Sequence, residues 1–294
     1  MTQSYESSIW SIDQALKFYK YVLQDLAPDE ADFFCIAARK KYLDESQRLA
    51  TRMGDTCMMN KTILKEHDEK KFVSKLHQTD AGMDWYTALN GNPLPRSCIV
   101  FYININHTSV HKAVKDFKHE LAEFDYEFAC ASMKNNADNA SRKLAGIHNR
   151  MLKAFQDPKN QTSNWLDVDM DIDKSRVSVQ DIVDAIQNME NINGKPALEV
   201  VPVIETQGGY HVLLSQFLMR VANKCVASIY KGSDIRNHVI TTDRVLNTLR
   251  SRFGDCGCKE ITMNQNKMVP LPGTLQNGFE VKLHMEGLCD TTTF

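Results

Sequence analysis

The sequence predicts an α+β protein in which a mixed α/β sheet follows an N-terminal helical region. Apolar residues near the N-terminus recur at helical spacing, whereas short β-branched runs alternate with amphipathic segments after about residue 96. Two of the later runs meet at paired glycines, as the strands of a β-hairpin do. The run Asn90-Gly91-Asn92-Pro93 separates the two patterns. We therefore expect a helical region over residues 1–95 and a main domain over residues 96–294.

Helices are expected in the first region. Apolar residues between Ile9 and Leu26 recur at steps of three and four, which indicates an amphipathic helix. Asp32 is placed to cap a second helix that ends in the basic run Arg39-Lys40-Lys41. The following stretch, to Asn92, is polar and predicts helical or irregular structure.

Strands and helices are both expected after residue 96. The run from Cys98 to Ile103 is apolar and β-branched, which is typical of a buried strand. By similar criteria, the further strands expected are 165–172, 198–206, 210–214, 259–263 and 278–285. Apolar side chains at helical spacing predict helices over 110–124, 140–155, 179–189, 215–230 and 242–252.

Composition and charge are those of an ordinary globular protein. The chain has 294 residues, of which 43% are hydrophobic and 24% charged. Its net charge of −2 means that any nucleic-acid surface must be a local basic patch. The sequence has neither a run of about 18 apolar residues nor the features of a signal peptide, so we expect a cytoplasmic protein without membrane contact.

The eight cysteines are scattered along the chain, which favours reduced thiols over a disulfide framework. Cys256-Gly257-Cys258 is the exception, with Cys225, His238 and Cys289 nearby in sequence. A zinc site from these residues stays open as an alternative, although the spacing matches no standard pair of zinc ligands.

Four aspartates alternate along the expected strand 165–172 and just beyond it. Side chains of a strand alternate between its two faces, so Asp167, Asp169, Asp171 and Asp173 share one side. Successive carboxylates then lie about 7 Å apart, and they repel one another unless a cation is bound. Mg²⁺ or Mn²⁺ is the expected cation, because hard cations bind a few carboxylates together with phosphate oxygens.

The acidic run has two other interpretations. A solvated acidic strand edge, with no ligand, stays open. A calcium-binding EF-hand fails in the register that starts at Asp167, because Ile172 and Ser178 stand where its glycine and glutamate belong. The register that starts at Asp169 fails in the same way, at Lys174 and Gln180.

A glycine turn follows the acidic run. Two apolar strands meet at Gln207-Gly208-Gly209, where glycine permits a close approach of backbone or phosphate. Exposed N–H groups of such a turn can bind anions. His211 stands two residues after the turn, where its ring could donate a hydrogen bond to a phosphate. A packed or surface histidine is the alternative.

The acidic strand and the glycine hairpin together resemble the first two motifs of the archaeo-eukaryotic primase superfamily, which includes PrimPol-like enzymes. Asp167 and Asp169 match the paired acids of that family, and His211 matches its histidine. Gly209 stands where the family usually has a serine. The resemblance covers about residues 96–285.

The third acid of the family has two candidates. Glu260 is preferred, because a Pro-Leu-Pro-Gly-Thr run at residues 270–274 follows it much as in the family. Asp243 is the alternative. No P-loop motif occurs in the sequence, so any unwinding activity would come from a separate helicase.

The resemblance implies an RRM-like palm sheet and a DNA primase or primase–polymerase that uses two divalent metals, Mg²⁺ or Mn²⁺. Its implied partners are nucleoside triphosphates and a single-stranded DNA template. The implied catalytic residues are Asp167, Asp169, His211 and Glu260, of which Asp167, Asp169 and Glu260 would bind metal. The implied nucleotide-binding residues are Thr206, Gly208, Gly209 and His211.

Two rival functions stay open. One is a metal-dependent nuclease or another nucleotidyltransferase, which would use the same acids. The other is a catalytically inactive, primase-like accessory protein that binds nucleic acid. Basic residues that could contact template or triphosphate, or could simply be solvated, are Arg39, Lys40, Lys41, Lys61, Arg96 and Lys267.

Overall fold

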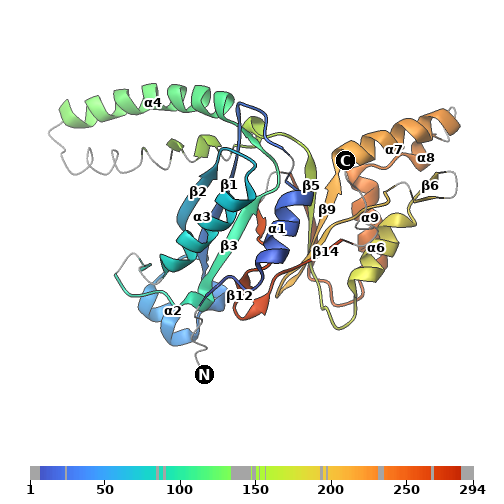
Figure 1. Cartoon of the computed structure of the whole chain (residues 1–294), viewed down its shortest axis with the longest axis horizontal. Helices are drawn as coiled ribbons and strands as arrows, with labels where there is room; N and C mark the ends of the chain where they lie inside the picture. Colours follow the sequence, from blue (N-terminus) through green and yellow to red (C-terminus); the bar gives the residue numbers. More distant parts are fainter. Residues whose placement is uncertain are drawn as a thin grey trace.

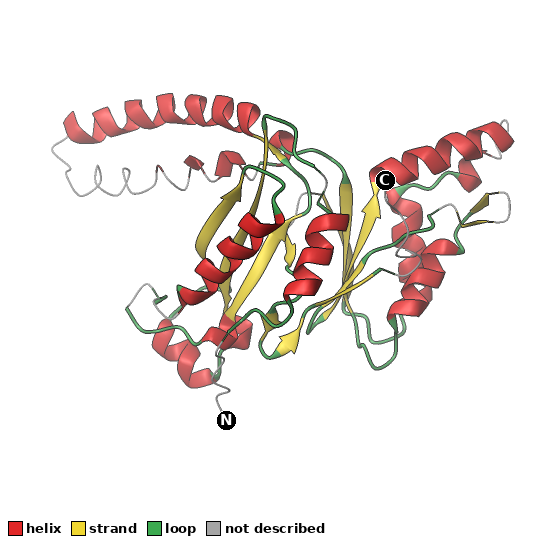
Figure 2. Ribbon diagram, in the orientation of Figure 1, coloured by secondary structure: helices red, strands yellow, loops and turns green. Residues whose placement is uncertain are grey.

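The structure is a computed structural model that describes residues 7–23, 25–83, 86–88, 91–133, 147, 150–151, 153–155, 157–192, 195–196, 198–230, 235–265 and 268–285. Within these residues, helices pack around two five-stranded sheets and two short hairpins (Figures 1 and 2). Each strand pairing described is antiparallel. The predicted α+β class is confirmed.

The first sheet has the strand order β11-β3-β1-β2, with β4 pairing to β1. Its strands are β1 (Glu30–Arg39), β2 (Thr56–Leu64), β3 (Ile99–Asn104), β4 (Thr108–Ser109) and β11 (Met268–Pro270). The helix predicted to begin after Asp32 is therefore wrong. Residues 31–38 are buried without interruption, and from Phe33 to Ala38 they are all apolar, as is typical of a central strand that is covered on both faces.

The expected helical region contributes both helices and strands. The predicted first helix is confirmed as α1 (Ile12–Tyr21), and the region also forms α2 (Glu45–Thr51) and α3 (Glu69–Ala81). However, β1 pairs with β2 on one side and with β3 on the other. The boundary expected near residue 95 therefore falls between strands of one sheet.

The second sheet has the strand order β10-β5-β9-β8-β14. Its strands are β5 (Trp165–Asp171), β8 (Val203–Glu205), β9 (Gly209–Ser215), β10 (Glu260–Gln265) and β14 (Lys282–His284). The acidic run is thus a strand beside the glycine hairpin, as predicted. With α6 (Val179–Gln187) and α9 (Thr242–Phe253), the main elements follow the order β-α-β-β-α-β, which is the ferredoxin-like split βαβ arrangement.

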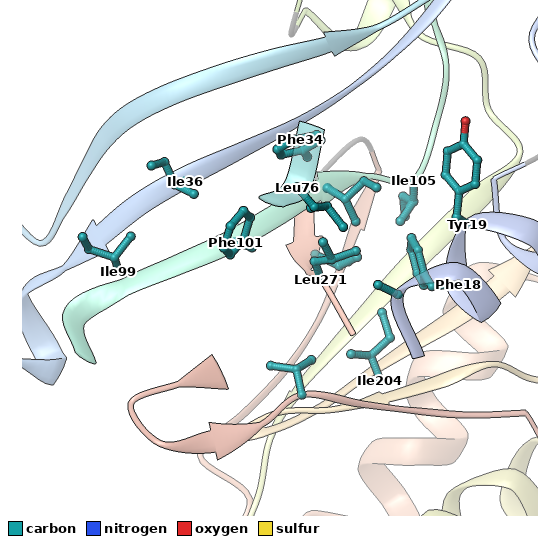
Figure 3. Close-up of a cluster of buried hydrophobic side chains, with 14 of the residues drawn as sticks. Phe18, Tyr19, Phe34, Ile36, Leu76, Ile99, Phe101, Ile105, Ile204 and Leu271 are labelled. Carbon is teal, nitrogen blue, oxygen red and sulfur yellow. The ribbon is translucent and has the colours of Figure 1, made fainter. Parts of the chain in front are cut away.

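Side chains on the two faces of β5 pack in two different hydrophobic clusters. Leu166, Val168 and Met170 pack with residues of α6, α9 and α7 (Gln216–Ile229). Trp165, on the acidic face, belongs to the other cluster, which contains α1 and residues of the first sheet. Figure 3 shows part of that cluster, with Ile204 of β8 among side chains of α1 and the first sheet. The acidic face of the second sheet therefore faces the first sheet.

The remaining elements lie outside the two five-stranded sheets. They are the long helix α4 (Val110–Met133), α8 (Ile235–His238), the short strands β6 (Asn191–Ile192), β7 (Lys195–Pro196), β12 (Leu275–Gln276) and β13 (Phe279–Glu280), and the 3-10 turns η1 (Lys40–Tyr42), η3 (Arg96–Cys98) and η4 (Pro158–Asn160). Most of the helix predicted over 140–155 lies outside the described residues. Within them, we find no helix with the length and apolar character needed to span a membrane.

Candidate functional site

The register of β5 with its two neighbours determines which side chains meet. Asp169 lies opposite His211 of β9 and Thr262 of β10. Asp171 lies opposite Gly209 and Glu260 in the same way. Because directly opposite residues in an antiparallel pair share a face, two of the predicted acids, the histidine and the glycine turn lie on one side of the sheet.

Asp167 is engaged by His211. The Asp167 side chain is fully buried, and its two oxygens lie 3.1 and 3.2 Å from His211 Nδ1. On the other side of the ring, His211 Nε2 lies 3.9 Å from Asp169 Oδ1. His211 therefore lies between the two acids of the motif, and Asp167 is not among the residues that line the adjoining cavity.

A cavity of about 360 Å³ lies between the two sheets at this point. One wall is acidic and belongs to β5 and β10, and another is basic and belongs to β1 and η1. The glycine turn forms a third side. The lining residues include Asp169, Asp171, Glu260, Thr262, Thr206, Gly208, Gly209, His211, Arg39, Lys41, Tyr102 and Gln276.

The glycine turn is held by hydrogen bonds on both of its strands. Thr206 donates its backbone N–H and its hydroxyl to Gly209 O, at 2.9 and 3.1 Å. Lys174 Nζ donates to Thr206 O at 2.7 Å, and Gln276 Oε1 accepts from Gln207 N at 2.9 Å. These bonds fix the backbone that faces the cavity.

Gly209 lies against β5 so closely that no side chain fits. A Cβ at this position would be 1.9 Å from Met170 O, well inside van der Waals contact. A glycine at this position is therefore required by the packing of β9 on β5. At Gly208, by contrast, an added Cβ would meet no heavy atom within 4 Å beyond the adjoining residues, so that position is sterically open.

The basic wall is formed by Arg39 and Lys41. Arg39 Nη1 donates to Tyr102 Oη at 2.6 Å, while Arg39 Nε is buried and has no hydrogen-bond partner among the described residues. Partial desolvation lowers the pKa of Lys41, and the charge of Arg39 acts in the same direction. The negative charges of Asp171 and Asp169, on the acidic wall, oppose this shift in pKa.

The structure distinguishes between the two candidates for the third acid. Glu260 begins β10 and lines the cavity. Asp243 lies in the first turn of α9 and borders a different surface depression. Of the two, Glu260 is therefore the one near the other predicted site residues.

Other predicted residues lie elsewhere. Arg96 is 3.4 Å from Asp80 Oδ1 and does not line the cavity, and neither does Lys40. The side chain of Lys61 and the whole of Lys267 lie outside what the structure describes, as does Cys289.

The cavity also has lining residues that are not among the binding residues that the sequence predicts, and Tyr102, Asp171 and Gln276 are three of them. Asp171 has a sequence signal, because it shares the acidic face of β5. Tyr102 and Gln276 have none, since only the pairing of distant strands brings them to the cavity.

The carboxylates of the cavity are of the kind that binds a hard cation when oxygen atoms of a ligand complete its coordination shell. Within the described residues, no group of three or more His, Cys, Asp or Glu side chains is arranged to hold a metal ion, so the predicted set of Asp167, Asp169 and Glu260 is not preassembled. The cavity nevertheless presents the carboxylates of Asp169, Asp171 and Glu260. Mg²⁺ is commonly held by one or two carboxylates together with water and phosphate oxygens.

We found no match to this chain among protein-family profiles, curated protein sequences or solved structures.

Proposed function

We propose that the protein is a divalent-metal-dependent nucleotidyltransferase of the primase–polymerase type. The observation that carries this proposal is a single cavity with an acidic wall (Asp169, Asp171 and Glu260) and a basic wall (Arg39 and Lys41). Nucleotidyl transfer needs both kinds of wall, because a triphosphate requires positive groups, and the metal ions that neutralise it require carboxylates.

The basic wall and the glycine turn would bind the triphosphate. Arg39 lines the cavity, and its guanidinium group can donate charge-assisted hydrogen bonds to phosphate oxygens. Lys41, at the rim, adds a second positive group. The exposed turn at Gly208 brings main-chain groups to the same cavity, where N–H groups can bind an anion.

The acidic wall would hold the metal. Asp169 is the central ligand of the proposal, with Asp171 or Glu260 beside it, and phosphate oxygens would complete the shell. When bound, such a metal stabilises the negative charge that develops as phosphate bonds form and break. His211, held by Asp167, orients a ring nitrogen toward Asp169 and the cavity.

The expected substrate is a nucleoside triphosphate on a single-stranded DNA template, with any unwinding done by a separate helicase. A nuclease would use the same acids and differ in its products, and an inactive accessory protein would bind nucleic acid without transfer. One experiment separates these three possibilities.

The test compares Asp169→Asn with Asp173→Asn. Wild-type protein, Mn²⁺, labelled nucleotides and primed or unprimed single-stranded DNA should give longer labelled products. Asp169→Asn should abolish this incorporation, because one charge fewer leaves the metal poorly held. Asp173→Asn is the matched control, because Asp173 belongs to the same run of aspartates in the sequence but lies beyond the end of β5, where its carboxylate accepts from Ser175, and does not line the cavity.

Thermal unfolding gives a second readout. Mn²⁺ together with a nucleoside triphosphate should raise the Tm of wild-type protein and of Asp173→Asn, but not that of Asp169→Asn. Shortened DNA would indicate a nuclease. Equal products and equal Tm shifts in both variants would place the site elsewhere.

A further inference from the structure

Helix α4 presents one side to solvent from His111 to Ala129. It begins beside β1, where Val110 N donates to Asp29 O at 2.6 Å, and spans 24 residues. It then extends beyond the sheets, as Figure 1 shows. Ala113 and Phe124 are the buried side chains among those described in this helix, and they lie on the side that faces the protein.

The exposed side of the first half of α4 is entirely basic. Five exposed residues lie on it, and their spacing of three, four and seven puts them on one side of the helix. At a rise of about 1.5 Å per residue, they form a stripe about 12 Å long. These residues, called here the α4 basic stripe, are His111, Lys112, Lys115, Lys118 and His119.

Helix stability does not account for this stripe. The first turns of a helix carry the positive end of its dipole, so lysines there are unfavourable. Within the described part of the chain, Lys112, Lys115 and Lys118 form no ion pair. Asp116, four residues after Lys112 and next to Lys115 in sequence, is 3.1 Å from Lys159 Nζ and accepts a hydrogen bond from Asn160 at 2.6 Å.

We propose that the α4 basic stripe binds the phosphate backbone of a nucleic acid without reading its sequence. Three ammonium groups on one exposed helix side, unpaired within the described residues, suit a regularly charged polyanion, and phosphate contacts of this kind carry no base specificity. The choice of a nucleic acid among polyanions rests on the proposed function. The stripe lies outside the cavity, so it is a second contact with the nucleic acid rather than part of the acidic site.

A second copy of this chain fits the stripe less well. The outer side of the second half of α4 is acidic at Glu123 and Asp125, so two antiparallel copies would match in charge. However, helix–helix interfaces bury interlocking apolar side chains. The outer side of the basic half offers none, since its exposed residues are the lysines and histidines of the stripe.

The experiment measures binding of fluorescent single-stranded DNA by anisotropy over a range of salt concentrations. The test variant combines Lys112→Gln, Lys115→Gln and Lys118→Gln. The matched control combines Lys17→Gln, Lys65→Gln and Lys70→Gln, which removes the same charge from exposed lysines on other parts of the fold.

The test variant should bind DNA about tenfold more weakly, or worse, at low salt. Its slope of log K against log salt should be shallower by about 2, since each phosphate contact on a single strand contributes about 0.7. The control should keep the slope of the wild type. Equal affinity and slope in both triple variants would overturn the proposal. So would a change in molar mass by light scattering, confined to the test variant, with DNA binding intact.

This outcome is distinguishable from failure of the proposed function. If no variant and no wild-type protein transfers nucleotides, the anisotropy comparison of the two triple variants still tests the stripe by itself.

Discussion

At the scale of single residues, the site depends on one buried hydrogen-bonded pair. Asp167 has no exposed surface, and His211 is the partner that both of its oxygens contact. A buried carboxylate is tolerated only where a hydrogen bond or an opposite charge compensates for lost water. His211 therefore has a structural task beside the phosphate contact predicted from the sequence.

The variant His211→Ala tests this double task. It should lower the free energy of unfolding by about 3 kcal/mol, because it leaves the carboxylate of Asp167 buried without its partner. It should also raise the nucleotide KM about tenfold to a hundredfold, through loss of a charge-assisted hydrogen bond. Urea denaturation and steady-state kinetics measure the two effects.

Adding Asp167→Asn to His211→Ala should restore part of the lost stability, since burying a neutral amide costs less free energy than burying a carboxylate. If His211→Ala unfolds at the same urea concentration as the wild type, the contact between Asp167 and His211 contributes nothing to the fold.

At the scale of elements, the hairpin β8–β9 is positioned by its fit against β5. Gly209 leaves no room for a side chain, whereas Gly208 is exposed and open. The turn that faces the cavity is therefore set by steric contact at one glycine and by hydrogen bonds at Thr206 and Gln207.

Substituting the two glycines one at a time should give opposite results. Gly209→Ala should cost about 3 kcal/mol or more of unfolding free energy, because its Cβ would overlap Met170 O and push the strands apart. Gly208→Ala is the control and should change stability by less than about 1 kcal/mol. Comparable losses for both variants, measured by urea denaturation, would contradict this assignment.

At the scale of the whole molecule, a buried polar cluster joins the two sheets at the end away from the cavity. Asn106 accepts from Asn164 N and Trp165 N, at 2.9 and 2.8 Å, and donates to Trp165 O at 3.0 Å. Asn104 donates to Asn106 O and to Asp32 Oδ1. The start of the acidic strand is thereby fastened to β1 and β3, which fixes one end of the space between the sheets.

His107 makes this junction sensitive to pH. Its Nδ1 lies 2.7 Å from Asp32 Oδ1, and both side chains are almost completely buried. Burial opposes a positive charge on His107, but the hydrogen bond and charge of Asp32 outweigh burial and raise the pKa of the imidazole above its ordinary value of 6.5. The folded protein therefore holds this proton more tightly than the unfolded chain does.

The stabilisation from this pair should be complete below about pH 6.5 and should be lost as pH rises through the folded pKa of His107. The urea midpoint of wild type should therefore exceed that of His107→Gln most at about pH 6, and by less at about pH 9. His77→Gln, at an exposed histidine of α3, serves as the control. A gap between wild type and His107→Gln that does not change with pH would disprove the linkage.

The sequence by itself determined the local features of the second sheet. Alternation of aspartate with Leu166, Val168 and Met170 specified a strand with one acidic and one apolar face, and paired glycines specified the adjacent hairpin. Both follow from the period of a strand and the geometry of a turn, which involve only near neighbours in sequence.

Tertiary structure alone decided the rest, because it depends on pairing between distant segments. Because β1 is buried on both faces, it is a strand where a helix was expected. The register of β5 with β9 brings His211 into contact with Asp167. The register of β5 with β10 brings Glu260, rather than Asp243, to the cavity. The basic wall at Arg39 comes from a strand more than a hundred residues before β5 in the sequence. No local pattern encodes such contacts, since they arise only when separate strands share a core.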